Sequence, residues 1–201
     1  MYPVSSSTTS RPARFSRRTI CCEGGHYLQI QPGTDKLYYP HRTDNRVVVL
    51  DTKTDRIVKI IPVAGGPVGV AFAPNGEVWL HEDGDGSVTV VDSKTDEVTK
   101  VLQTGGKGAG RMAVSPDGKW AASTHGGSQD VAIIDAVNKE VVGTVTIGRG
   151  PGFPVFSPDG TKLYVMNSGE GDVCVIDPKA MKVAARYKVG VNPFGGGLRV
   201  R

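Results

Sequence analysis

Short apolar runs alternate with polar, glycine-rich turns along most of the chain, and the alternation repeats with a period of 42 residues. The runs are rich in β-branched side chains and are bounded by Gly, Pro, Asn and Asp. This pattern predicts short strands joined by tight turns. Because no segment carries a helical 3.6-residue period of useful length, the sequence predicts an all-β fold.

A proline marks the period most clearly, because it returns in the same small turn of every repeat. The four copies are Pro32, Pro74, Pro116 and Pro158. In the last three, Asn or Asp and then Gly follow the proline, and each of these residue types favours a turn for its own physical reason. A fixed period of 40-odd residues is the signature of a repeat architecture.

Each repeat contains four strand signals. An inner segment precedes the proline turn, an apolar stretch follows it, and a β-branched run ending in aspartate comes next, at residues 47–51, 88–92, 131–135 and 173–177. A polar turn then leads to a fourth strand, and a glycine-rich crossing connects to the next repeat. Four antiparallel strands per 40-odd residues form the blade of a β-propeller.

The best-preserved unit runs from Ser157 to Asn167 and continues over residues 173–177. It resembles the YVTN-repeat β-propellers, since Tyr164-Val165-Met166-Asn167 stands where that family's motif belongs and departs from it by one residue. The resemblance covers roughly residues 24–201. It implies relatives that include secreted or periplasmic surface proteins, haem-binding propellers of nitrite reductases and periplasmic DNA-binding proteins. It therefore implies an architecture and only loosely a function.

Counting repeats predicts four blades and the start of a fifth. The expected blades are about residues 24–65, 66–107, 108–149 and 150–191, with a partial blade at 192–201. The resemblance implies about seven or eight blades for a complete ring, so we expect an incomplete one. Such an array exposes sheet edges, which predicts association of copies into a homo-oligomer.

Charge is concentrated at the N-terminus. Residues 1–20 contain four arginines and no acid, and the remaining residues balance 20 basic against 20 acidic side chains, so the net charge of +4 belongs to this segment. We expect residues 1–20 to be a disordered basic Ser/Arg-rich segment, with an organelle transit peptide as the alternative. The charge balance gives no support for a broad nucleic-acid-binding face, and DNA binding is a weaker alternative. No apolar run approaches the length of about 20 residues that a membrane span needs.

Candidate chemistry gathers on one face of the predicted propeller. Propeller topology places the crossings between blades and the turns after the second strands on the same face, which we call the crossing face. Imidazoles and cations that converge there could hold an anionic ligand, a metal or haem propionates. The alternative is that these positions simply tolerate polar side chains. The candidate ligand-binding residues are His41, Arg42, His81, Glu82, Lys107, Arg111, His125, Arg149 and Asn167.

Other polar residues have structural interpretations. The repeated strand-end aspartates should accept backbone N–H bonds from the following turns. Asp83, Asp85 and Ser87 resemble a calcium loop but are expected to be turn residues, and the three cysteines are expected to be structural. Ser123 or Ser128 beside His125 would suit a hydrolase, with no support beyond proximity in sequence. The strand-end aspartates are Asp51, Asp92, Asp135 and Asp177, and the cysteines are Cys21, Cys22 and Cys174.

These observations favour a non-enzymatic binding or scaffold protein that presents the crossing face to a protein partner or a small anionic ligand. No metal and no cofactor is predicted. The alternative is a fragment of a cofactor-binding or enzymatic propeller, of the haem-dependent reductase or lactonase kind. The family resemblance would place the protein in the periplasm or outside the cell.

Overall fold

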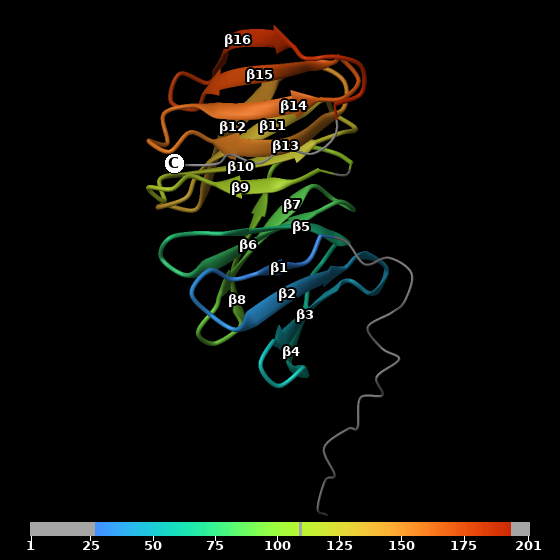
Figure 1. Ribbon diagram of the computed structural model, residues 1–201, viewed down its shortest axis with the longest axis vertical. Coiled ribbons are helices and arrows are strands. Elements are labelled where there is room, and N and C mark those ends of the chain that lie inside the picture. Colours follow the sequence, from blue (N-terminus) through green and yellow to red (C-terminus); the bar gives the residue numbers. More distant parts are fainter. Residues whose placement is uncertain (1–26, 109, 194–201) are drawn as a thin grey trace, which may run out of the picture.

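A computed structural model describes residues 27–108 and 110–193. Within them the chain forms four separate antiparallel sheets of four strands each, and the strands of each sheet follow one another in sequence order. Figure 1 shows the sheets stacked from the first at the bottom to the fourth at the top. The predicted all-β fold is confirmed, and the four sheets are four propeller blades. The expected disordered segment, Cys21, Cys22 and the expected strand of a fifth blade at residues 194–201 lie outside the described residues.

The strands are short. Blade 1 comprises β1 (Gln29–Ile30), β2 (Lys36–His41), β3 (Arg46–Asp51) and β4 (Arg56–Pro62), with a 3₁₀ turn η2 (Arg42–Asp44) after β2. Blade 2 comprises β5 (Pro67–Phe72), β6 (Glu77–Glu82), β7 (Ser87–Asp92) and β8 (Glu97–Gln103). Blade 3 comprises β9 (Met112–Val114), β10 (Trp120–His125), β11 (Asp130–Asp135) and β12 (Glu140–Thr146). Blade 4 comprises β13 (Pro151–Phe156), β14 (Leu163–Asn167), β15 (Asp172–Asp177) and β16 (Lys182–Lys188).

The turns that the sequence predicts form with local hydrogen bonds. In the third proline turn, the Gly118 amide donates to the Ser115 carbonyl at 2.9 Å, and Gly118 has φ of +71°, a conformation that favours glycine. The strand-end aspartates act as expected. Asp135 Oδ1 accepts the amides of Val137 and Asn138 at 3.0 and 2.9 Å. The Asn138 amide and the other donors hold the pKa of Asp135 below its usual range.

Apolar side chains on both faces of the sheets join the blades. Three buried clusters lie between blades 1 and 2, 2 and 3, and 3 and 4. In the last, Ile133 and Val131 of blade 3 pack with Leu163 and Ile176 of blade 4, and all four are fully buried. Blades 2 and 3 therefore each supply one apolar face to the blade before them and the opposite face to the blade after them.

A polar or apolar pair recurs at the edge of each of these interfaces, and we call it the interblade rung. It joins the residue at the start of the second strand of one blade to the residue four positions after the strand-end aspartate of the next. That second residue has a left-handed backbone in every blade, with φ of 53–56° at Asp55, Asp96, Lys139 and Met181. Two of these pairs are ion pairs, Lys36–Asp96 at 2.6 Å and Lys139–Glu77 at 2.7 Å. At the junction of blades 3 and 4 the same positions hold Trp120 and Met181, which both pack against the apolar cluster between these blades.

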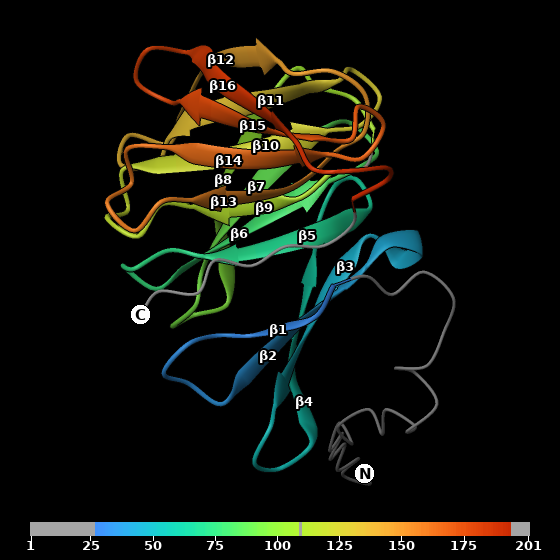
Figure 2. The ribbon, with the colours of Figure 1, turned by 45° about the horizontal axis from the view of Figure 1, so that its top comes forward.

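The predicted grouping of loops on two faces is confirmed. On the crossing face, the amide of Gly127 in the turn after β10 donates to the Lys107 carbonyl of the preceding crossing at 2.8 Å. On the opposite face, the Ala136 amide of the post-aspartate turn donates to the Lys119 carbonyl of the proline turn at 2.9 Å. Figure 2 shows that the array is open, with blades 1 and 4 at its two ends. In the described part of the chain, no helix has the length and apolar character to cross a membrane.

Candidate functional site

One position of the repeat lines the axis of the array. Tyr27, Gly69, Arg111 and Phe153 are spaced by 42 residues and lie in or beside the inner strand of each blade. All four line a cavity of about 180 Å³ between the inner strands. Three copies of the repeat deliver a side chain to this axis, while the missing side chain of Gly69 lets the backbone at Arg111 and Met112 approach closely.

Arg111 is the charged member of this set. Its guanidinium carbon lies 3.8 Å from the centroid of the Tyr27 ring and 5.3 Å from that of Phe153. The two rings meet edge to face, with centroids 5.6 Å apart. Cation–π attraction holds the guanidinium in this position, and Nη1 donates to the Gly110 carbonyl at 2.8 Å.

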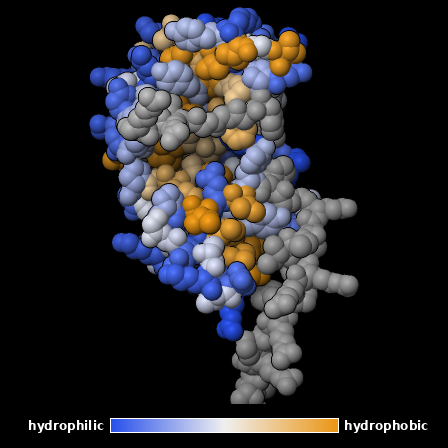
Figure 3. All heavy atoms as spheres, in the orientation of Figure 1, coloured by the Kyte–Doolittle hydropathy of each residue, from blue (hydrophilic) through white to orange (hydrophobic). Residues whose placement is uncertain are grey.

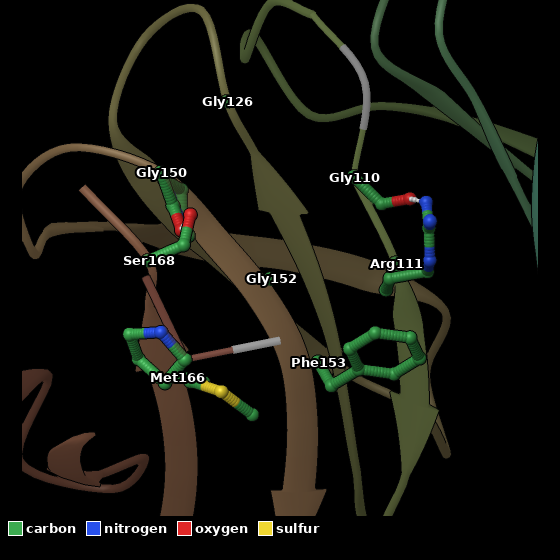
Figure 4. Close-up of a pocket in the computed structure, with 10 residues that line it drawn as sticks. Gly110, Arg111, Gly126, Gly150, Gly152, Phe153, Met166 and Ser168 are labelled. Atoms are coloured by element: carbon green, nitrogen blue, oxygen red, sulfur yellow. Dashed lines mark hydrogen bonds between the residues drawn. The ribbon is translucent and has the colours of Figure 1, made fainter. Parts of the chain in front are cut away.

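A second cavity of about 240 Å³ opens from Arg111 and Phe153 toward the crossing face. Figure 4 shows Phe153 and Arg111 on one side of it and Met166 and Ser168 on the other. The remaining lining residues are Gly110, Gly126, Gly150, Pro151, Gly152 and Pro193. Four of the ten lining residues are glycines, so backbone forms part of the wall.

Two of these glycines are dictated by close packing. A Cβ at Gly110 would overlap the Thr124 carbonyl oxygen, and a Cβ at Gly150, where φ is +70°, would lie 2.5 Å from Ser168 Oγ. Gly152 differs, because a Cβ there would lie 3.6 Å from the Met166 carbonyl oxygen, an ordinary van der Waals distance. Gly152 thus leaves part of the cavity open without being required by its neighbours.

The charged side chain that lines the two cavities is positive. Arg111 is the charged side chain among their lining residues, and no acidic side chain lines either one. Its buried Nε atom has no hydrogen-bond acceptor, and no carboxylate pairs with its guanidinium, within residues 27–108 and 110–193. A desolvated cationic donor of this kind is costly unless something accepts from it.

Two of the predicted histidines come together, but away from the cavities. His81 and His125 are fully buried between blades 2 and 3, with ring centroids 5.5 Å apart. His81 Nδ1 lies 2.8 Å from Ser123 Oγ. Burial, the His125 ring and Arg111 lower the pKa of His81 to about 3. Burial also lowers the pKa of His125, although Asp130, 2.8 Å from Nδ1, opposes this.

A serine, a histidine and an aspartate lie next to one another in space, as in a hydrolase triad: Ser123, His125 and Asp130. Their distances and burial do not suit catalysis. His125 Nε2 is 3.4 Å from Ser123 Oγ and only 2.9 Å from Thr104 Oγ1. Ser123 and His125 have no exposed surface, and neither lines the two cavities. The serine oxygen therefore has no access to a substrate at these cavities.

The other predicted residues are dispersed along the crossing face. His41 is buried against the Tyr39 ring, Arg42 pairs with Asp83, and Arg149 Nε donates to Glu170 at 3.0 Å. The buried Glu82 accepts from the Gly65 amide and the Thr89 hydroxyl, the buried Asn167 donates to Asp172 at 3.0 Å, and Lys107 is exposed. Of the nine predicted residues, Arg111 lines the cavities and the others do not.

Sequence reasoning missed Tyr27 and Phe153. The signal was available, because both lie at multiples of 42 residues from Arg111. Asp85 fits its predicted turn role, since Oδ1 accepts the Ser87 amide at 3.0 Å. Cys174 is a buried free cysteine within β15.

The described residues do not form a cluster of side chains that could coordinate a metal ion. No three His, Cys, Asp or Glu side chains in this part of the chain are grouped so as to hold a metal ion. No described histidine lines either cavity. The buried histidines therefore do not fit a role as axial haem ligands.

Comparison with known proteins supports the fold. No family model and no curated protein matches this chain. Among solved structures, it is similar to Kuenenia stuttgartiensis hydrazine synthase, with a TM-score of 0.74 and 22% sequence identity over 88% of this chain. The match covers 52% of that chain, so this protein spans about half the length of the structure it resembles. At this identity the likeness shows the fold alone.

The buried histidines predict a pH-dependent stability. Because the pKa of His81 falls from 6.5 in the unfolded chain to about 3 in the folded protein, the unfolded state binds the extra proton between these values. The contribution of His81 to the free energy of unfolding is therefore fully present above about pH 6.5. It falls by about 1 kcal/mol for each pH unit below that value. Urea unfolding at pH 7, 6 and 5 measures the slope. His81→Asn should flatten it, and an unchanged slope would contradict the assignment.

Gly110 and Gly152 both line the outer cavity but differ in how closely their neighbours pack, so their alanine variants can be compared. Gly110→Ala should destabilise the protein by about 1–3 kcal/mol, because the new Cβ overlaps backbone that cannot move freely. Gly152→Ala should change stability by less than about 0.5 kcal/mol, because its neighbours leave room. Thermal denaturation of the two variants tests the difference, and equal losses would show that the cavity wall is not packed as described.

Proposed function

We propose that this protein is a non-enzymatic binding propeller of the YVTN-repeat type, and that it binds a small anionic ligand around Arg111. The observation that carries the proposal is the guanidinium of Arg111. It lines a cavity beside two aromatic rings that contact each other, with a buried Nε that lacks an acceptor among the described residues. A planar guanidinium is the side chain best suited to a carboxylate or phosphate.

The size of the site favours a small ligand. The outer cavity of about 240 Å³ is below the about 300–1,000 Å³ typical of drug-sized ligand sites. The aromatic rings of Tyr27 and Phe153 provide an apolar surface beside the cation. These features together favour a compact anion with an apolar or aromatic body, such as an aromatic carboxylate.

The YVTN-type assignment rests on the repeat itself. Its period of 42 residues, the motif at residues 164–167 and the four-stranded blades agree with one another. The sealed positions of Ser123 and His125 favour binding over catalysis at this face. The runner-up remains a cofactor-binding or enzymatic propeller, and a haem absorption band in the purified protein would favour it.

Calorimetric titration with benzoate and with inorganic phosphate tests the proposal. Arg111→Met should weaken binding of the better probe about ten- to hundredfold, because a charge-assisted hydrogen bond contributes about 1.5–3 kcal/mol. The matched control is Arg149→Met, since Arg149 lies on the same face, is exposed and is already paired with Glu170. It should leave the dissociation constant nearly unchanged.

Two outcomes would contradict the proposal. Equal losses in the Arg111 and Arg149 variants would indicate a diffuse charge effect. Binding of a Glu-containing peptide without any binding of benzoate or phosphate would favour a side chain of a protein partner as the anion.

A further inference from the structure

The outward face of blade 4 carries residues that every other blade buries. Tyr187 in β16 pairs with Val173 in β15 and is 59% exposed. The residues in the same register position of blades 1, 2 and 3 are Ile61, Leu102 and Val145, which are 2%, 6% and 7% exposed. Those three pack against the following blade. Blade 4 thus has the face that receives a following blade, with no described residue covering Tyr187.

The outward face of blade 1 shows the complementary exposure. Leu28 and Ile30 of the inner segment are each 54% exposed. The residues 42 and 84 positions after Leu28 are Val70 and Met112, which are 3% and 7% exposed and pack against the preceding blade. Figure 3 shows hydrophobic residues at the surface in both the upper and the lower half of the molecule. Blade 1 therefore has the face that receives a preceding blade.

The charges at the two ends are complementary in the same register. Lys162 directly precedes Leu163, which pairs with Ile176 as Leu37 pairs with Leu50, so Lys162 of blade 4 occupies the rung position of Lys36. Asp55 of blade 1 occupies the rung position of Asp96. Asp55 has φ of 54°, nearly identical to the 55° of Asp96. Both Lys162 and Asp55 are exposed, and neither forms an ion pair with another described residue. Joining the two faces would create the Lys36–Asp96 rung again.

We propose that blade 4 of one copy packs on blade 1 of a second copy, and that two copies close one ring. The contact continues the interface that already joins consecutive blades, with the same apolar positions and the same ion pair. Two copies of four blades make eight, which lies within the range of four to eight blades typical of propellers. A two-fold axis would relate the copies, so that each copy uses both end faces and the same contact forms twice, which closes the ring.

Sedimentation velocity of the full chain at about 100 µM tests the pairing, since a specific interface of this kind should have a micromolar or lower dissociation constant. The expected species is a dimer. Tyr187→Asp should shift it to monomer, because it places a charge in the centre of the apolar face. The control is Val137→Asp, since Val137 is 68% exposed in the turn between β11 and β12 and lies on neither end face. Circular dichroism should show both variants folded.

A charge-swap experiment tests which faces meet. Lys162→Glu and Asp55→Lys should each weaken self-association at least about tenfold, because both interfaces of the homodimer then oppose like charges. Mixing the two variants should restore the dimer. One interface then pairs the introduced glutamate with the introduced lysine, and the other pairs native Lys162 with native Asp55.

Three outcomes would overturn the proposal. The first is a monomeric wild-type chain at that concentration. The second is a dimer that the mixed variants do not restore, which would indicate that blade 4 pairs with blade 4. The third is growth into long oligomers, which would show head-to-tail contact without closure of a two-copy ring.

Discussion

The structure depends on the packing of one blade against the next. A four-stranded sheet with apolar side chains on both faces cannot bury them alone, because each face needs a separate partner. The three interblade clusters supply this burial, and they include most of the fully buried large side chains. The stacking also brings the four inner segments to a common axis. The cavity around Arg111 is thus a by-product of the same packing that stabilises the fold.

Between blades 2 and 3 the packing is partly polar. The polar side chains of His81, Ser123, His125 and Thr104 lie there with at most 5% of their surface exposed. Buried polar groups of this kind require matched partners, so they restrict how the two blades can be placed against each other. The histidines remain neutral because a charge there would lose its hydration. Their hydrogen bonds to Ser123 and Thr104 help to fix the position of blade 3 against blade 2. Arg111 lies directly before the inner strand of blade 3.

Much of the fold could be predicted from the sequence, because its signals are local. The proline turns, the strand-end aspartates and the strand runs each depend on a few neighbouring residues. The site was harder, since it depends on how closely loops approach one another. The end of β10 lies on the crossing face as predicted, yet the Gly106 crossing packs directly on the His125 ring and closes it off. Arg111 was identified by its charge, whereas its aromatic neighbours meet it only through the stacking of blades 1, 3 and 4.

The interblade rungs also have a consequence for folding. Repeats of similar shape can pair out of order, and such misassembly is a characteristic failure of repeat proteins. Here the successive rungs are Lys with Asp, Glu with Lys, and Trp with Met. If blade 1 met blade 3, Lys36 would face Lys139, and if blade 2 met blade 4, Glu77 would face Met181. Within one copy, the three junctions thus differ in chemistry at a position that repeats in geometry, and an exchange of neighbours would lose the two ion pairs.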